Sequence, residues 1–150
     1  MEENFTRSKE LFAKSCTQNG IDYCHDWYFY HVVDLGNGIM TPGVFDYQTQ
    51  IGLYQFPEDM TGLNVLDVGA STGFFSFHFA RKGAHVLAVD LPSLNELDAF
   101  PGQTKAHILE KFNKNLVLAA PDSAFTLDDA YRLVVTEPFD FCNQILGLNL

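Results

Sequence analysis

The chain has 150 residues, enough for one domain with a hydrophobic core. Its composition, 47% hydrophobic and 14% aromatic, is that of a globular protein and excludes a disordered one. Nine Lys and Arg residues against 19 Asp and Glu residues give a formal net charge of -10, which disfavours sequence-independent binding to a nucleic-acid backbone.

The sequence shows no signal for a membrane or for export. No apolar run approaches the ~20 residues of a membrane span, and the acidic start at residues 1–3 lacks the basic and apolar regions of a signal peptide. The three cysteines, Cys16, Cys24 and Cys142, form no Cys-x-x-Cys pair, as is typical of reduced thiols in the cytosol. We therefore expect a cytoplasmic protein without a metal site.

The first sixty residues predict a helix followed by an irregular, aromatic segment. Residues 6–18 have helical spacing of apolar side chains, with a stop at Asn19-Gly20. Residues 23–35 favour an extended strand, which a tight turn at 36–38 joins to residues 39–40 as a hairpin. The pattern between residues 44 and 54 is compatible with a short helix. We expect residues 1–60 to form an N-terminal helix and a cap or lid.

The centre of the chain predicts a strand, a glycine turn, a helix and a second strand. An apolar run at residues 65–68 is followed by Gly69 and Gly73, which allow the backbone to turn sharply and to approach a ligand closely. The phenylalanine-rich residues 74–81 then favour a helix packed on a sheet. A second strand at 84–89 ends at Asp90, where a carboxylate can bind a ribose diol.

The last sixty residues predict mainly helices. A short helix is expected at residues 106–113, and helical pieces at 127–146 are interrupted where Pro138 removes an amide donor and starts a new helix. Gly147 is a good helix stop, and residues 148–150 have the pattern of an incipient third strand. We therefore expect a sheet that stops after its second or early third strand.

Two known glycine patterns fit this loop poorly. The nicotinamide fingerprint Gly-x-Gly-x-x-Gly has a glycine where this chain has Ser71, and its third glycine is displaced. A short-chain-dehydrogenase loop has a glycine where Phe75 stands, and no Tyr-x-x-x-Lys pair follows.

A third pattern fits. Asp67-x-Gly69-x-x-x-Gly73 after an apolar strand, with Asp90 ending the next strand, resembles the cofactor site of class I S-adenosylmethionine-dependent methyltransferases. Residues 27–46 and 139–150 are also similar to relatives of tRNA wobble-uridine (mo5U34) methyltransferases. The resemblance implies an α/β fold with a Rossmann-like, doubly wound parallel sheet, in which residues 61–150 form a truncated N-terminal half of the methyltransferase domain.

The resemblance also implies a site for S-adenosylmethionine. The methionine part of the cofactor would lie over the loop, Asp67 would orient its amino group, Asp90 would bind the ribose, and Leu91 would lie against adenine; the loop residues are Gly69, Ala70, Ser71 and Gly73. Should the acceptor need a general base, the candidate catalytic residues are His31, Tyr47 and Asp46, each of which has a structural or cofactor-lining role as the alternative.

The implied reaction is methyl transfer to an unidentified acceptor, a small molecule or a nucleoside-containing one. Tyr47-Gln48-Thr49 stands where carboxy-S-adenosylmethionine users have Trp-Lys-Trp, so carboxymethyl transfer is not expected. A tRNA acceptor follows from the resemblance but is disfavoured by the charge. The aromatic residues 27–30 suggest either a stacking site for an acceptor or a hydrophobic lid.

An alternative prediction is a non-catalytic chain. It would be a cofactor-binding or degenerate interaction fragment that lacks the acceptor-binding half, inactive by itself, with a missing C-terminal half or a homo-oligomer as its partner.

Overall fold

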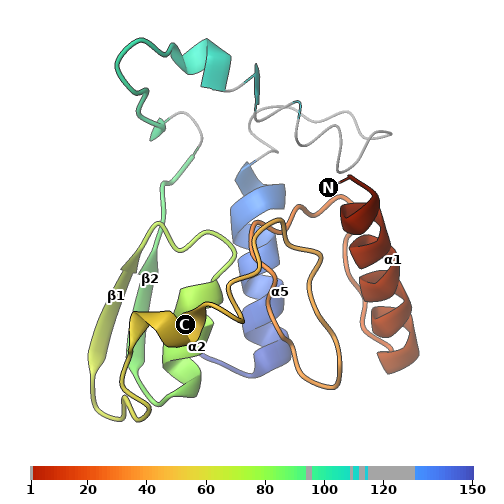
Figure 1. The fold of residues 1–150 in the computed structure, drawn as a ribbon, viewed down its shortest axis with the longest axis vertical. Coiled ribbons are helices and arrows are strands. Elements are labelled where there is room, and N and C mark those ends of the chain that lie inside the picture. The colour runs from red at the N-terminus through yellow and green to blue at the C-terminus, as the bar shows by residue number, and fades with distance from the viewer. Residues whose placement is uncertain (1, 94–95, 109, 112–113, 115–130) are drawn as a thin grey trace.

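The computed structural model describes residues 2–93, 96–108, 110–111, 114 and 131–150. These residues form an α/β structure with a two-stranded parallel sheet (Figure 1). In chain order the elements are α1 (Glu2–Asn19), the 3-10 turn η1 (Ile51–Tyr54), β1 (Asn64–Val68), α2 (Phe74–Arg81), β2 (His85–Val89), the π-helical turn η3 (Arg132–Thr136) and α5 (Glu137–Leu146).

The predicted strand, turn, helix and strand at the centre of the chain are confirmed. β1 and β2 pair in parallel, with Asn64 opposite His85 and Val68 opposite Val89. The turn after β1 contains positive φ angles of 78° at Gly69 and 84° at Gly73, a conformation that L-residues rarely adopt. α2 then returns the chain to the start of β2, as a parallel connection requires.

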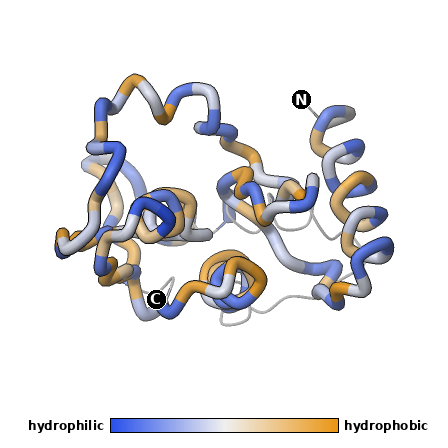
Figure 2. The backbone as a smooth tube through the Cα atoms, turned by 90° about the horizontal axis from the view of Figure 1, so that it is seen from below, coloured by the Kyte–Doolittle hydropathy of each residue, from blue (hydrophilic) through white to orange (hydrophobic). Residues whose placement is uncertain are grey.

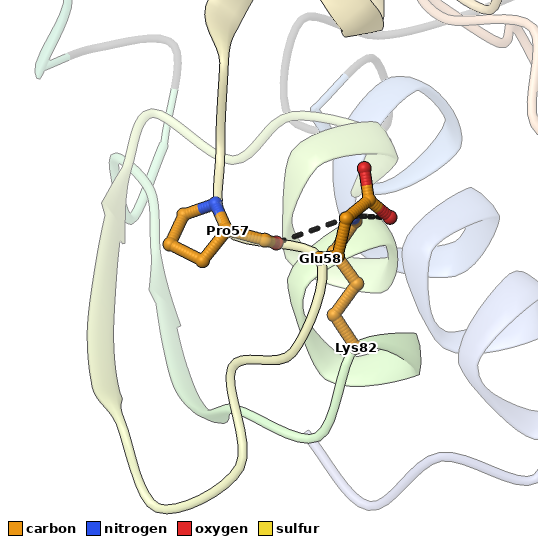
Figure 3. A network of polar contacts seen from close by, with 3 residues as sticks. All are labelled: Pro57, Glu58 and Lys82. Atoms are coloured by element: carbon orange, nitrogen blue, oxygen red, sulfur yellow. Dashed lines mark hydrogen bonds and ion pairs between the residues drawn. The ribbon is translucent and has the colours of Figure 1, made fainter.

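Polar contacts beside the sheet join the segment before β1 to the end of α2. The Lys82 ammonium, just after α2, donates to the Pro57 carbonyl at 3.2 Å and pairs with the Glu58 carboxylate at 3.1 Å (Figure 3). The Lys82 carbonyl accepts from the Met60 amide at 2.8 Å. The chain entering β1 is therefore held against the end of α2, although the exposed ion pair itself contributes little stability.

Among the described residues, helices cover one face of the sheet. α2, α5 and α1 all lie on the same side of it (Figure 1). The side chains on the other face are exposed, at 61% for Leu66, 74% for Val68, 63% for Leu87 and 37% for Val89. The expected doubly wound arrangement, with helices on both faces, is thus not formed by the described residues.

The expected third strand at residues 148–150 is wrong. The backbone there closes the end of α5, because the Leu148 amide donates to the Asn143 carbonyl at 3.1 Å. The Asn143 side-chain amide donates to the Leu150 carbonyl at 3.3 Å. These contacts occupy two backbone groups that a strand could use for pairing. Gly147 ends α5, as predicted, with a φ of 63°.

The predicted N-terminal helix is confirmed and begins at Glu2, four residues earlier than expected. Hydrophobic and hydrophilic residues alternate along α1, next to the N label (Figure 2). Phe12 and Cys16, one turn apart, are buried against Phe29 and Phe141. One hydrophobic cluster therefore combines residues from both predicted segments, 1–60 and 61–150.

The predicted hairpin forms its turn but not its strands. Only isolated bridges join His31 to Phe45 and Asp34 to Met40. The Thr41 hydroxyl accepts from the Val33 amide at 2.7 Å and donates to the His31 carbonyl at 2.9 Å, so a side chain takes one donor of the backbone ladder, while the Thr41 amide still donates to the Val33 carbonyl at 3.0 Å.

The short helix expected between residues 44 and 54 is reduced to η1. Asp46 Oδ1 accepts from the Gln48 amide at 3.0 Å, which forms a turn before η1.

α5 has proline in its first turn, as predicted, but the interruption predicted there is wrong: residues 131–136 are already helical, and η3 leads into α5 without a break. Residues 127–130, and several residues of the helix expected at 106–113, lie outside the described residues; residues 105–108 are helical. In the part of the chain that the structure describes, no helix has both the length and the apolar character to span a membrane.

Candidate functional site

A cavity of about 360 Å³ lies at the carboxyl ends of β1 and β2. Ligands bind at this edge in open α/β sheets, and the volume is within the range of small-molecule sites. The loop after β1, the end of β2 and the η3–α5 segment line it, through Ala70, Ser71, Ala88, Val89, Asp90, Leu91, Pro92, Tyr131, Val135, Thr136, Phe139, Asp140 and Leu150.

Asp90 joins the two strand ends at the mouth of this cavity. Its Oδ2 accepts from the Ser71 amide at 2.6 Å, and its Oδ1 accepts from the Leu91 amide at 2.7 Å. Each carboxylate oxygen has a second lone-pair direction, so Asp90 can still accept hydrogen bonds from a ligand. Ser71 has a φ of 50°, and its amide is directed at Asp90 in this left-handed conformation.

The two loop glycines have different surroundings. A Cβ added at Gly73 would lie 2.4 Å from Phe77 Cε2 and 2.9 Å from Phe139 Cδ2, so the loop packs closely on α2 and α5. A Cβ at Gly69 would meet no atom within 4 Å. Gly73 is therefore needed for packing, whereas the open space at Gly69 allows the close approach of a ligand that the sequence predicted.

The far wall of the cavity was not predicted from the sequence. Tyr131 directly precedes η3, Thr136 ends η3 and Asp140 lies in α5, all far along the chain from the second strand. Burial, with a smaller contribution from the negative charge of Asp90, raises the pKa of Tyr131 to about 12. Local spacing carries no signal for this wall, because it depends on how α5 packs against α2, where the Phe139 ring lies 4.9 Å from the Phe77 ring between centroids.

The charge of the lining is negative. Asp90 and Asp140 line the cavity, and none of the described lining residues is Lys, Arg or His. Such a lining favours a ligand with positive charge and disfavours one with phosphate groups.

The sequence-predicted site residues fall into two groups. Ala70, Ser71, Asp90 and Leu91 line the cavity. The remaining ones are not among its lining residues: Gly69, Gly73, Asp67, His31, Tyr47 and Asp46. Asp67 lies on the covered face of β1, where its Oδ2 accepts from the Ser76 hydroxyl at 2.6 Å.

The three candidate catalytic residues belong to the upstream segment. His31 is only 6% exposed, and burial lowers its pKa to about 4, against a smaller opposing effect of Asp67. The Tyr47 ring lies 5.7 Å from the His31 ring, between centroids, while Asp46 is exposed and forms the turn described above. The structure thus brings His31 and Tyr47 together, but on the α2 side of the glycine loop.

The aromatic residues 27–30 have mainly packing roles. Phe29 is buried, and Trp27 packs on Phe141 at 4.9 Å between ring centroids while its indole N–H donates to Glu137 at 2.6 Å. Trp27 and Phe29 therefore agree with the prediction of a hydrophobic segment. Tyr30 is the exposed aromatic side chain among residues 27–30. In the described part of the chain, no three His, Cys, Asp or Glu side chains are grouped to hold a metal ion.

Comparison with known proteins gives a short similarity. Over 66 residues, 42% of this chain, the sequence is 35% identical to magnesium-protoporphyrin O-methyltransferase of Rhodobacter capsulatus. The chain spans 30% of that relative's length. No protein-family profile matches, and no solved structure matches. The similarity supports the methyltransferase superfamily, and it gives no support for the wobble-uridine subfamily in particular.

Proposed function

We propose that this chain binds S-adenosylmethionine in the cavity at the ends of β1 and β2 and serves a methyl-transfer reaction. One observation carries the proposal. The Ser71 amide in the glycine loop donates to Asp90 at the end of β2, beside a cavity whose charged lining side chains, among those described, are acidic. The partial similarity to an O-methyltransferase adds support.

The lining fits the parts of this cofactor. Asp90 retains lone pairs for a ribose diol, and Leu91, Val135 and Phe139 offer apolar surface to a planar base. Asp90 and Asp140 complement a cationic group, such as a sulfonium or an ammonium. A dinucleotide would place two phosphates in the same acidic surroundings, so NAD fits less well.

The bound sulfonium would supply an electrophilic methyl group, and the chain would supply binding and alignment. None of the three sequence-predicted bases lines the cavity, so we assign no proton transfer to them. We propose a small acceptor in preference to a tRNA, because a net charge of -10 opposes contact with a phosphate backbone. If the chain belonged with the relatives of tRNA wobble-uridine methyltransferases, its acceptor would be a nucleoside.

Calorimetric titration tests the cofactor class. The purified chain is titrated with S-adenosylhomocysteine, S-adenosylmethionine and NAD, and folding is monitored by circular dichroism. We expect micromolar binding of the two sulfur nucleosides and none of NAD. A folded chain that binds NAD better, or binds neither sulfur nucleoside, would refute the proposal.

The bare face of the sheet favours a second candidate function, a cofactor-binding chain that is inactive alone. Parallel sheets are normally covered on both faces, yet Leu66, Val68, Leu87 and Val89 are exposed together. All four side chains are aliphatic, so the surface that covers this face would be apolar.

We therefore propose further polypeptide of a methyltransferase domain as the cover, in line with the relative, of which this chain spans 30%. The test is transfer of a labelled methyl group from S-adenosylmethionine to nucleosides, tRNA and phenolic small molecules. We expect the isolated chain to bind the cofactor and transfer nothing, and transfer to any of these acceptors would refute this second candidate.

A further inference from the structure

The glycine loop is attached to the upstream segment by a buried pair, His31 and Thr72. The His31 backbone amide donates to Thr72 Oγ1 at 3.0 Å, and the same hydroxyl lies 3.4 Å from His31 Nδ1. His31 is 6% exposed and Thr72 0%. Because the hydroxyl oxygen accepts from the amide, its own proton is available to Nδ1, which then acts as the acceptor of a neutral ring.

Thr72 occupies a critical place in the loop. It lies between Ser71, with a φ of 50°, and Gly73, which precedes α2. A left-handed conformation is unfavourable for an L-residue such as serine and persists only where the surroundings hold it. The Ser71 amide reaches Asp90 in this conformation, so whatever fixes Thr72 also fixes the contact at the mouth of the cavity.

His31 is itself firmly held on the other side of the pair. Its carbonyl accepts from the Thr41 hydroxyl at 2.9 Å. The backbone of Gly43 passes so close that an added Cβ would lie 1.9 Å from the His31 carbonyl carbon. The imidazole lies among the rings of Tyr47 and Phe74, at 5.7 and 5.9 Å between centroids. His31 therefore offers the loop a rigid point of attachment.

We propose that His31 and Thr72 are positioning residues that hold the Ser71 turn in its ligand-binding conformation, and that His31 does not act as a base. The upstream segment thereby controls the shape of a cavity that it does not line. As far as it concerns a ligand, this inference rests on the proposed cofactor function. Its structural part, the dependence of the Ser71–Asp90 contact on Thr72, stands without a ligand.

Two matched substitutions separate the hydroxyl from the volume of the side chain. Thr72→Val keeps the shape and removes both contacts, whereas Thr72→Ser keeps the hydroxyl. Each variant is titrated with S-adenosylhomocysteine, and the Ser71 amide is followed by ¹⁵N nuclear magnetic resonance. We expect Thr72→Ser to bind within about twofold of the unaltered chain and Thr72→Val to bind about tenfold more weakly, the loss expected for one or two hydrogen bonds.

The Ser71 amide resonance gives the second measurement. We expect it to move in Thr72→Val and to stay in place in Thr72→Ser. An unchanged resonance together with unchanged affinity in Thr72→Val would overturn the inference. If the unaltered chain binds no sulfur nucleoside, the proposed cofactor fails, and the resonance alone decides whether Thr72 holds the turn.

A further variant covers the case in which Thr72→Val does not fold. His31→Phe retains the backbone amide contact and removes Nδ1, so we expect a smaller loss of affinity, about threefold, with a smaller shift of the Ser71 resonance. An effect of His31→Phe on neither quantity would show that the ring takes no part. Thr49→Val, at an exposed threonine, is the control and should change nothing.

Discussion

Gly73→Ala is expected to destabilise the protein much more than Gly69→Ala, although both glycines have similar positive φ angles of 84° and 78°. The left-handed conformation costs an alanine about 1–2 kcal/mol at either position. At Gly73 the new Cβ would also lie 2.4 Å from Phe77 Cε2 and 2.5 Å from its Cζ, and such overpacking costs about 1–3 kcal/mol more. At Gly69 there is no atom within 4 Å to add to the backbone cost.

The difference between the two variants is the quantity to measure. Thermal unfolding followed by near-ultraviolet circular dichroism should give a midpoint roughly 2–12 °C lower for Gly73→Ala than for Gly69→Ala, since 1 kcal/mol corresponds to about 2–4 °C at this chain length. Phe77→Leu removes both ring atoms, so the double variant should lose less stability than the sum of the single variants. Equal midpoints for the two alanine variants, or strict additivity with Phe77→Leu, would refute the packing argument.

Three further predictions concern the site, the pH dependence and the bare face. Asp90→Ala should weaken binding of S-adenosylhomocysteine roughly ten- to hundredfold in calorimetry, because it removes hydrogen-bond acceptors for the ligand and the partner of the Ser71 amide. An equal or larger loss in Asp140→Ala would contradict the placement of the ligand at Asp90. Burial lowers the pKa of His31 from 6.5 to about 4, so between these pH values only the unfolded chain binds this proton. In urea titrations the free energy of unfolding should therefore fall as the pH falls through this range, and it should fall less steeply in His31→Gln. An equal slope in both proteins would speak against a buried neutral ring. Val68→Lys should leave the unfolding midpoint of the isolated chain almost unchanged, as surface substitutions do, and a drop of several degrees would mean that this face is packed.

The central unit could be predicted from the sequence because its determinants are local. The apolar run of β1, the turn glycines and the phenylalanines of α2 each encode their own conformation within a few residues. The same holds for Gly147, whose left-handed conformation ends α5. The prediction of hairpin strands was wrong because the Val33 amide donates to the Thr41 hydroxyl. Propensity scales do not include this competition between a side chain and the backbone.

The candidate site divides in the same way. Ser71 and Asp90 were predicted from the loop pattern and the end of the second strand, and they meet at 2.6 Å. Tyr131 and Asp140 reach the cavity only through the packing of η3 and α5, which depends on contacts across the fold. The position of His31 beside Thr72 is also non-local, since 41 residues separate them. The sequence therefore named His31 as a candidate base without revealing the groups that surround it.

The sequences of β1 and β2 are more apolar than a sheet with one exposed face requires. In β1 the side chains of Val65 and Asp67 face α2, while Leu66 and Val68 on the opposite face are apolar as well. A strand with one face in water normally alternates apolar and polar residues, whereas one covered on both faces is apolar throughout. After Asn64 at its start, β1 has the second pattern apart from Asp67, whose carboxylate accepts a hydrogen bond from the Ser76 hydroxyl. Its sequence is therefore suited to a sheet with two covered faces, and a helix layer packed over Leu66 and Val68 would bury the side chains that are now exposed.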